Sequence, residues 1–242
     1  MLAKQSTLWV TAFLFCNSLL FGSLTREIVD INPQHLFVPS GFDDNDQVEI
    51  ITDGYLPDTC YRIRPTQVFI DLDKKRITVQ PKAQLFPGVC MDVTVPFTTV
   101  VPISAGVPTG NYEITTKNGS LKERLFVAPA PFSSPDDYLY APVDKATVEN
   151  TMQGTQTATV YGRFTNSCSM IDNIKITVTD KTIQVLPVMK QSDKDQHGNP
   201  CAAEERPFEE RITLPKLATG RYLLHVRSLN GQSVNQVFNS QN

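Results

Sequence analysis

Cysteine is the residue type in this chain whose spacing most strongly suggests chemistry. The chain has five cysteines and three histidines. A nucleophilic cysteine needs a base, usually histidine, held beside it. The stretch GYLPDTC (54–60) places Cys60 after a Pro-Asp turn, and the nearest histidine in the sequence, His35, precedes it by 25 positions. We therefore interpret this stretch as a strand end, a turn and half of a structural disulfide.

Other catalytic patterns do not occur in the sequence. There is no Gly-x-Ser-x-Gly elbow, no glycine-rich phosphate loop and no Cys-x-x-Cys pair. His197 falls in a polar loop, and His225 falls on what we predict to be the outward face of a strand beside Tyr222 and Leu224. We predict no catalytic residue, no cofactor and no bound metal, and hence a protein that is not an enzyme.

One acidic stretch partly matches a calcium-binding loop. Asp193, Asp195, Gly198 and Glu204 fit positions 1, 3, 6 and 12 of such a loop, but His197 at position 5 is a poor calcium ligand and no helices flank the stretch. We favour a solvated hairpin loop rigidified by Cys201. Because loops on rigid scaffolds carry recognition, we predict that this loop binds a partner. The candidate binding residues are Asp193, Asp195, His197 and Asn199.

The first 23 residues predict a secretory signal peptide. Lys4 gives a positive start, and Leu8–Phe15 (LWVTAFLF) is an apolar run that is short for a membrane span. Two alternatives stay open, namely an uncleaved N-terminal anchor and a lipid on Cys16. Export favours pairing of the other four cysteines, because thiols pair outside the cytoplasm. They are Cys60, Cys90, Cys168 and Cys201.

The spacing of several landmarks indicates two copies of one module. Gly54 precedes Cys60 by six residues, as Gly162 precedes Cys168, and the next cysteine follows after 30 and 33 residues respectively. Internal repeats of this kind mark repeated structural units. Further landmarks recur in the same order: Pro96-Phe97 and Pro207-Phe208, Thr109-Gly110-Asn111-Tyr112 and Thr219-Gly220-Arg221-Tyr222, and Asn118-Gly119 and Asn230-Gly231.

Each copy should fold alone and so carry its own bridge, which predicts the disulfides Cys60–Cys90 and Cys168–Cys201. Residues 128–142 (APAPFSSPDDYLYAP) contain four prolines and predict a stiff linker. We therefore expect a lead-in over 24–37 that adds a strand to the first module, a first module over 38–127 and a second over 143–242.

Short alternating runs predict strands throughout both copies. Val48–Thr52, Val68–Leu72 and Arg76–Val79 in the first copy match Thr157–Tyr161, Ile174–Val178 and Thr182–Val185 in the second. No segment has a sustained helical period. The sequence therefore predicts an all-β fold of two tandem immunoglobulin-like β-sandwich domains. Tyr112 and Tyr222, each two residues after a glycine, are candidates for a tyrosine corner.

The order Gly-Tyr-Leu-Pro-Asp-x-Cys, hairpin, Cys, Pro-Phe, Gly-x-Tyr and Asn-Gly resembles a small β-sandwich module that recurs in secreted and envelope proteins of bacteria. The resemblance covers both copies, although Arg163–Ser167 replaces the Tyr-Leu-Pro-Asp-Thr stretch in the second. That family has no defined activity, so the resemblance implies a fold and export, and no reaction.

The net charge of −3 without a long run of one sign argues against a nucleic-acid partner. We expect an exported protein, periplasmic, attached to the outer envelope or secreted, with no membrane span after signal removal. Its expected partner is another envelope or extracellular protein. The alternative is a secreted enzyme inhibitor that uses Tyr55–Cys60, or an enzyme built on the loops around His197 and Asp195.

Overall fold

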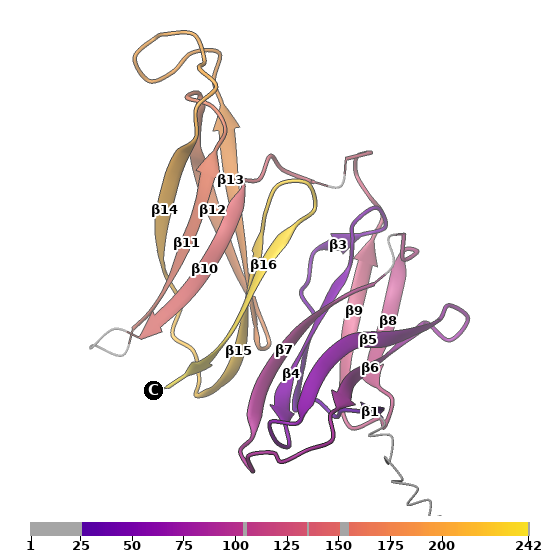
Figure 1. Cartoon of the computed structure of the whole chain (residues 1–242). Coiled ribbons are helices and arrows are strands. Elements are labelled where there is room, and N and C mark those ends of the chain that lie inside the picture. The colour runs from indigo at the N-terminus through magenta and orange to yellow at the C-terminus, as the bar shows by residue number, and fades with distance from the viewer. Residues whose placement is uncertain (1–25, 104–105, 135, 151–154, 242) are drawn as a thin grey trace, which may run out of the picture.

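The computed structural model describes residues 26–103, 106–134, 136–150 and 155–241, and these form two β-sandwiches in tandem (Figure 1). The described residues contain sixteen strands and no helix, which confirms the predicted all-β fold. The predicted signal peptide over 1–23 lies outside the described residues. No helix in the described ranges is long and apolar enough to cross a membrane.

The first module consists of two facing sheets. One has the strand order β2-β4-β7, and the other has the order β1-β6-β8-β9-β3, with β5 also paired to β6. The strands are β1 (Glu27–Asp30), β2 (His35–Phe37), β3 (Phe42–Asp43), β4 (Glu49–Leu56), β5 (Tyr61–Asp71), β6 (Arg76–Leu85), β7 (Val95–Pro102), β8 (Gly110–Thr116) and β9 (Lys122–Ala128).

The second module repeats this plan with the sheets β10-β11-β14 and β12-β13-β15-β16. In each module an equivalent neighbouring pair is parallel, β6 with β8 and β13 with β15, because the chain crosses to the other sheet between them. In the first module the short β3 also pairs parallel with β9. The strands are β10 (Val143–Asn150), β11 (Gln156–Phe164), β12 (Ser169–Thr179), β13 (Thr182–Gln191), β14 (Arg206–Thr213), β15 (Gly220–Arg227) and β16 (Ser233–Ser240).

Each module has its own hydrophobic core between its sheets, as strand alternation requires. In the first, Ile50 of β4 and Ile77 of β6 pack with Tyr112 and Ile114 of β8. In the second, the core consists of Val143, Ala146, Ala158, Val160, Ile183, Val185, Ile212, Leu214, Leu217, Tyr222, Leu224, Val226 and Phe238.

The repeated glycine and Pro-Phe landmarks meet across one sheet. Gly54 lies opposite Phe97, and Gly162 lies opposite Phe208. A Cβ on Gly162 would overlap the Pro142 carbonyl oxygen and the Phe208 ring, and a Cβ on Gly54 would come within 3.2 Å of the Phe97 ring. A glycine is therefore required at 162, whereas at 54 a larger residue would be tightly placed against Gln34 and Phe97.

The Gly-x-Tyr landmark forms a second repeated contact. Tyr112 donates a hydrogen bond from its hydroxyl to the Pro108 carbonyl oxygen (2.7 Å), which is the bond expected of a tyrosine corner. Lys75 and Lys181, from equivalent hairpin turns, place their ammonium groups 3.3 and 3.1 Å from the hydroxyls of Tyr112 and Tyr222. The landmark thus joins a hairpin turn to the neighbouring strand in both modules.

The lead-in and the segment between the modules are parts of the sandwiches. The lead-in contributes β1, which pairs with the end of β6, and β2, which pairs with β4. Residues 139–141 occupy the position in the second module that β1 occupies in the first, since Tyr140 forms an antiparallel β-bridge with Val188 of β13. The segment between the modules contacts both of them at its described residues. Asp44 of the first module accepts from the Ala130 amide, and Asp136 accepts from the amides of residues 230 and 231 in the second.

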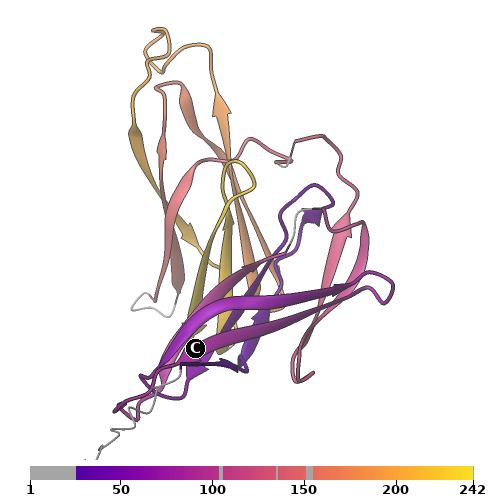
Figure 2. The ribbon, with the colours of Figure 1, turned by 45° about the vertical axis from the view of Figure 1, so that its right-hand side comes forward.

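The two modules pack directly on one another. The β2-β4 face of the first module meets the β15-β16 face of the second, and their apolar contact is formed by Phe37, Ile51, Leu223 and Val237. Figures 1 and 2 show β15 and β16 standing beside the first module from two directions. The chain is therefore a joined pair of sandwiches, in which part of each outward sheet face is covered.

Candidate functional site

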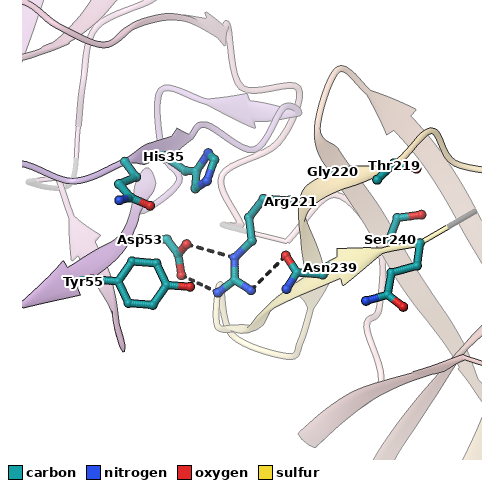
Figure 3. A pocket seen from close by; sticks show the side chains of 10 residues that line it. His35, Asp53, Tyr55, Thr219, Gly220, Arg221, Asn239 and Ser240 are labelled. Carbon is teal, nitrogen blue, oxygen red and sulfur yellow. Dashed lines mark hydrogen bonds and ion pairs between the residues drawn. The ribbon is translucent and has the colours of Figure 1, made fainter. Parts of the chain in front are cut away.

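A polar cleft of about 380 Å³ opens at one edge of the contact between the modules. Figure 3 shows His35, Asp53 and Tyr55 on the first-module side and Arg221, Asn239 and Ser240 on the other. These residues come from β2, β4, β15 and β16, so four strands far apart in the sequence build it.

An ion pair crosses the floor of this cleft. The Arg221 guanidinium donates from Nε and Nη2 to the two Asp53 carboxylate oxygens (3.0 and 2.8 Å), and from Nη1 to Asn239 Oδ1 (3.3 Å) (Figure 3). Thr98 donates to the same carboxylate. The hydrogen bond with Asp53 raises the pKa of Arg221. Because both charges are matched, the cleft suits recognition of neutral polar groups rather than capture of an ion.

A second ion pair is fully enclosed between the modules. Arg227 Nη2 lies 2.7 Å from Asp46 Oδ1, and the two side chains are only 5% and 2% exposed. Burial raises the pKa of Asp46, and the Arg227 charge offsets this only in part. A buried pair of this kind adds little net stability but penalises any misalignment, because separation leaves a buried charge unmatched. It therefore fixes how the modules sit together.

A histidine network lies at the same contact. His225 Nδ1 is 2.8 Å from Asn235 Oδ1, while Asn235 Nδ2 donates to Glu49 of the first module (3.0 Å) and to Ser233 (2.8 Å). The amide nitrogen faces two acceptors, so its oxygen faces His225, and Nδ1 of the ring carries the proton.

The prediction that His225 faces outward into solvent is wrong, because the first module covers that face. The side chain is fully buried, with the Phe42 ring against it at 6.1 Å between centroids. Its Nε2 has no hydrogen-bond partner within the described part of the chain. Burial lowers the pKa of His225 to about 4.

Both predicted disulfides, Cys60–Cys90 and Cys168–Cys201, are present in the structure. They are consistent with an oxidising, exported environment. GYLPDTC forms the end of β4, a turn and the half-cystine, as predicted. Each bridge anchors a long loop, and the two loops lie at opposite ends of the molecule (Figure 1).

The loop over 86–94 in the first module presents apolar side chains to solvent. Val89 is fully exposed, and Met91 and Val93 are more than half exposed. Thr59 fixes the loop, since its amide donates to the Met91 carbonyl oxygen and its hydroxyl accepts from the Met91 amide. The loop backbone is therefore tied to Thr59 at Met91, while the three apolar side chains stay exposed to solvent.

The corresponding loop of the second module, over 192–205, is polar. Asp193, His197 and Asn199 are exposed, and Asp195 Oδ1 accepts from the His197 and Asn199 amides (both 2.8 Å). These hydrogen bonds, first among them the one from the Asn199 amide, lower the pKa of Asp195. The structure thus places the four predicted binding residues in one loop, with the Asp195 carboxylate engaged by its own turn.

The described residues offer one group of metal-type ligands, Asp58, Cys60 and Cys90. Both cysteines are joined in the disulfide, and Asp58 Oδ1 accepts from the Cys60 amide at 2.7 Å. This cluster is therefore a bridged turn.

Sequence reasoning missed the contact between the modules. A signal was available in β15, where Leu223, His225 and Arg227 alternate with the core residues of the same strand. A strand whose second face mixes apolar and charged groups is typical of a face that another surface covers. The apolar 86–94 loop was also missed, although Val89, Met91 and Val93 alternate beside a half-cystine.

Comparison with known protein families identifies the module. A family model described as the ORF11 beta-sandwich domain matches residues 50–127 and again 158–240. No curated protein and no solved structure matches the chain significantly. The two matched regions cover most of both modules, so the chain belongs to the ORF11 beta-sandwich domain family as a tandem pair.

Proposed function

We propose that this tandem member of the ORF11 beta-sandwich domain family is an exported, non-enzymatic protein of the bacterial envelope that binds another envelope or extracellular protein. The observation that carries the proposal is the 86–94 loop, which exposes Val89, Met91 and Val93 on a frame fixed by a disulfide. Because the disulfide and Thr59 already hold the loop backbone, binding costs little backbone entropy, so such a loop suits a protein partner with an apolar depression.

The 192–205 loop supplies a second, polar contact at the far end of the molecule. Its Asp195-centred turn and the Cys168–Cys201 bridge hold it in shape. Because the modules are locked together by the Asp46–Arg227 pair, the two loops keep a fixed separation. A protein built in this way can bridge two partners or align one long partner.

The polar cleft supports binding rather than catalysis. The Arg221 and Asp53 charges neutralise each other, and the groups beside them are hydrogen-bonding side chains such as Tyr55 and Asn239. This arrangement suits recognition of a peptide backbone or amide at the junction of the modules.

The test is partner binding by the exported protein with a modified loop. The substitutions Val89→Ser and Met91→Ser together are expected to weaken partner binding in the envelope at least about tenfold, since each removes an exposed apolar anchor. Val100→Thr, at an exposed valine on β7, is the matched control and should bind normally. Equal binding by all three proteins would contradict the proposal.

A second candidate function is inhibition of a secreted enzyme. It is favoured by the way in which Thr59 and the Cys60–Cys90 bridge tie the 54–60 and 86–94 stretches to each other. An inhibitor of this kind would lose activity on Pro57→Gly, which loosens the turn, while the protein stays folded. Activity that is instead lost on His197→Ala or Asp195→Asn would indicate the loop-based enzyme.

A further inference from the structure

The β5 strand of the first module is a long, open sheet edge. Its eleven residues pair only with β6 among the described strands, and none of them is buried. The β5–β6 hairpin reaches out beyond the rest of the module in both views (Figures 1 and 2). Natural proteins usually protect such an edge, because its free backbone groups are a template for pairing with another strand.

The first half of this edge is protected against pairing with another strand, and the second half is not. Pro65 and a bulge between Arg64 and Gln67 interrupt its first half. The second half, Gln67–Asp71, is regular and contains Val68, Phe69 and Ile70 in succession. Phe69 is 57% exposed, Ile70 is 39% exposed, and Leu72 in the following turn is 48% exposed.

The equivalent edge of the second module is better protected. In the 174–178 stretch of β12, Lys175 and Thr177 separate Ile174, Ile176 and Val178, so no apolar residues are consecutive there. The ammonium group of Lys175 lies 3.7 Å from the centroid of the Tyr138 ring. Ile176 and Val178 are also partly exposed, at 38% and 41%, so what distinguishes the first module is its run of consecutive apolar residues with the exposed Phe69.

We propose that β5 pairs with β5 of a second copy of this chain, antiparallel about a two-fold axis, to form a homodimer with one continuous sheet. A two-fold axis perpendicular to the sheet places one residue opposite its own copy. With Val68 opposite Val68, Gln67 lies opposite Phe69 and the bulge lies opposite Ile70. Arg64 then lies opposite Asp71 of the other copy.

This register is complementary in charge and in apolar contact. Opposite residues in an antiparallel pair point to the same face, and the bulge keeps Arg64 and Asp71 on the outer face together. Two Arg64–Asp71 pairs therefore flank the axis, and in each of them Asp71 is shared with the amide and ammonium of Lys74 in its own turn. The two Phe69 rings are diagonal neighbours, within reach of each other on that face. Arg62 falls beyond the paired strands and already donates to the Thr59 and Tyr61 carbonyl oxygens.

The test is the sedimentation of the purified, disulfide-bonded protein over a wide range of concentration. A reversible dimer is expected. Arg64→Asp and Asp71→Arg should each weaken the dimer about tenfold, since each places like charges opposite one another at two symmetric positions. The double variant Arg64→Asp/Asp71→Arg should restore it. The double variant Arg62→Asp/Asp71→Arg is the matched control and should not.

Phe69→Lys supplies an independent test, because this exposed position tolerates a lysine in the folded monomer and a lysine protects an edge. It should give a monomer with an unchanged melting temperature at low concentration. A wild-type protein that is monomeric at every concentration would overturn the proposal. This outcome is also the one expected if β5 pairs with a strand of a different protein and not with a second copy. A dimer that ignores Phe69→Lys, or that the Arg64–Asp71 exchange does not rescue, would overturn it as well.

Discussion

Acid is expected to weaken this fold through one buried histidine, His225. Its ring is fully buried against the first module, and burial lowers its pKa from 6.5 to about 4. As the pH falls from 7 to 4, the unfolded chain takes up a proton on this ring and the folded chain does not. The unfolded state then binds more protons, so the free energy of unfolding falls as the pH falls.

The size of the effect follows from the two pKa values. Each pH unit between the two pKa values lowers the free energy of unfolding by about 1.4 kcal/mol, so the interval from 6.5 to about 4 lowers it by about 3 kcal/mol. This is a large part of the stability of an ordinary domain, which is about 5–15 kcal/mol. The loss should be complete near pH 4 and absent above pH 7.

The assay is urea unfolding of wild type and His225→Gln at a series of pH values from 7 to 4. Glutamine keeps a donor for Asn235 and does not titrate. Carboxylates change both curves alike, so the difference between the two proteins isolates the histidine. That difference should move by about 3 kcal/mol in favour of the variant as the pH falls. Leu224→Ala, a core change on the same strand, should cost the same at every pH. Parallel curves for wild type and His225→Gln would refute the reasoning.

Three further predictions concern stability and are read by the same unfolding assay. Asp46→Ala takes a carboxylate away from the buried Arg227 and should lower the free energy of unfolding by about 3 kcal/mol. The double change Asp46→Leu/Arg227→Met should recover most of this loss. An equal loss in both variants would contradict the role given to the ion pair. Gly162→Ala should lower the free energy of unfolding by about 3 kcal/mol because its Cβ overlaps Phe208, and Gly54→Ala should lower it by about 1 kcal/mol. A larger loss for Gly54→Ala than for Gly162→Ala would contradict this account. Cys168→Ser should cost about 3 kcal/mol, since the bridge closes a loop of 33 residues, and no change in stability would show that the bridge is not formed.

Local patterns in the sequence were sufficient to predict the sandwiches. Strand alternation in Arg76–Val79 and Thr182–Val185 depends on nearby residues alone, and both segments are strands in the structure. The spacing of the repeat predicted the two disulfides, because equivalent modules need equivalent bridges. These features are encoded within one module at a time.

The contact between the modules could not be predicted in this way. Arg221 meets Asp53 across 168 positions, and Arg227 meets Asp46 across 181, so no local pattern relates them. His225 shows the consequence, since the same alternation that predicts an outward side chain cannot tell solvent from a second module. The proline-rich stretch suggested separation, while its Asp136 and Tyr140 attach it to the second module.

Photocrosslinking from position 91, in the envelope of the protein's own host, tests the binding role most directly. A photoreactive residue in place of Met91 is expected to give one dominant protein adduct, and the adduct should disappear when Val89→Ser and Val93→Ser are added. The same photoreactive residue at Val100, on β7, should give none. If the exported protein gives no adduct at position 91, or the same adducts at both positions, the 86–94 loop is not a protein-binding surface and the account is contradicted.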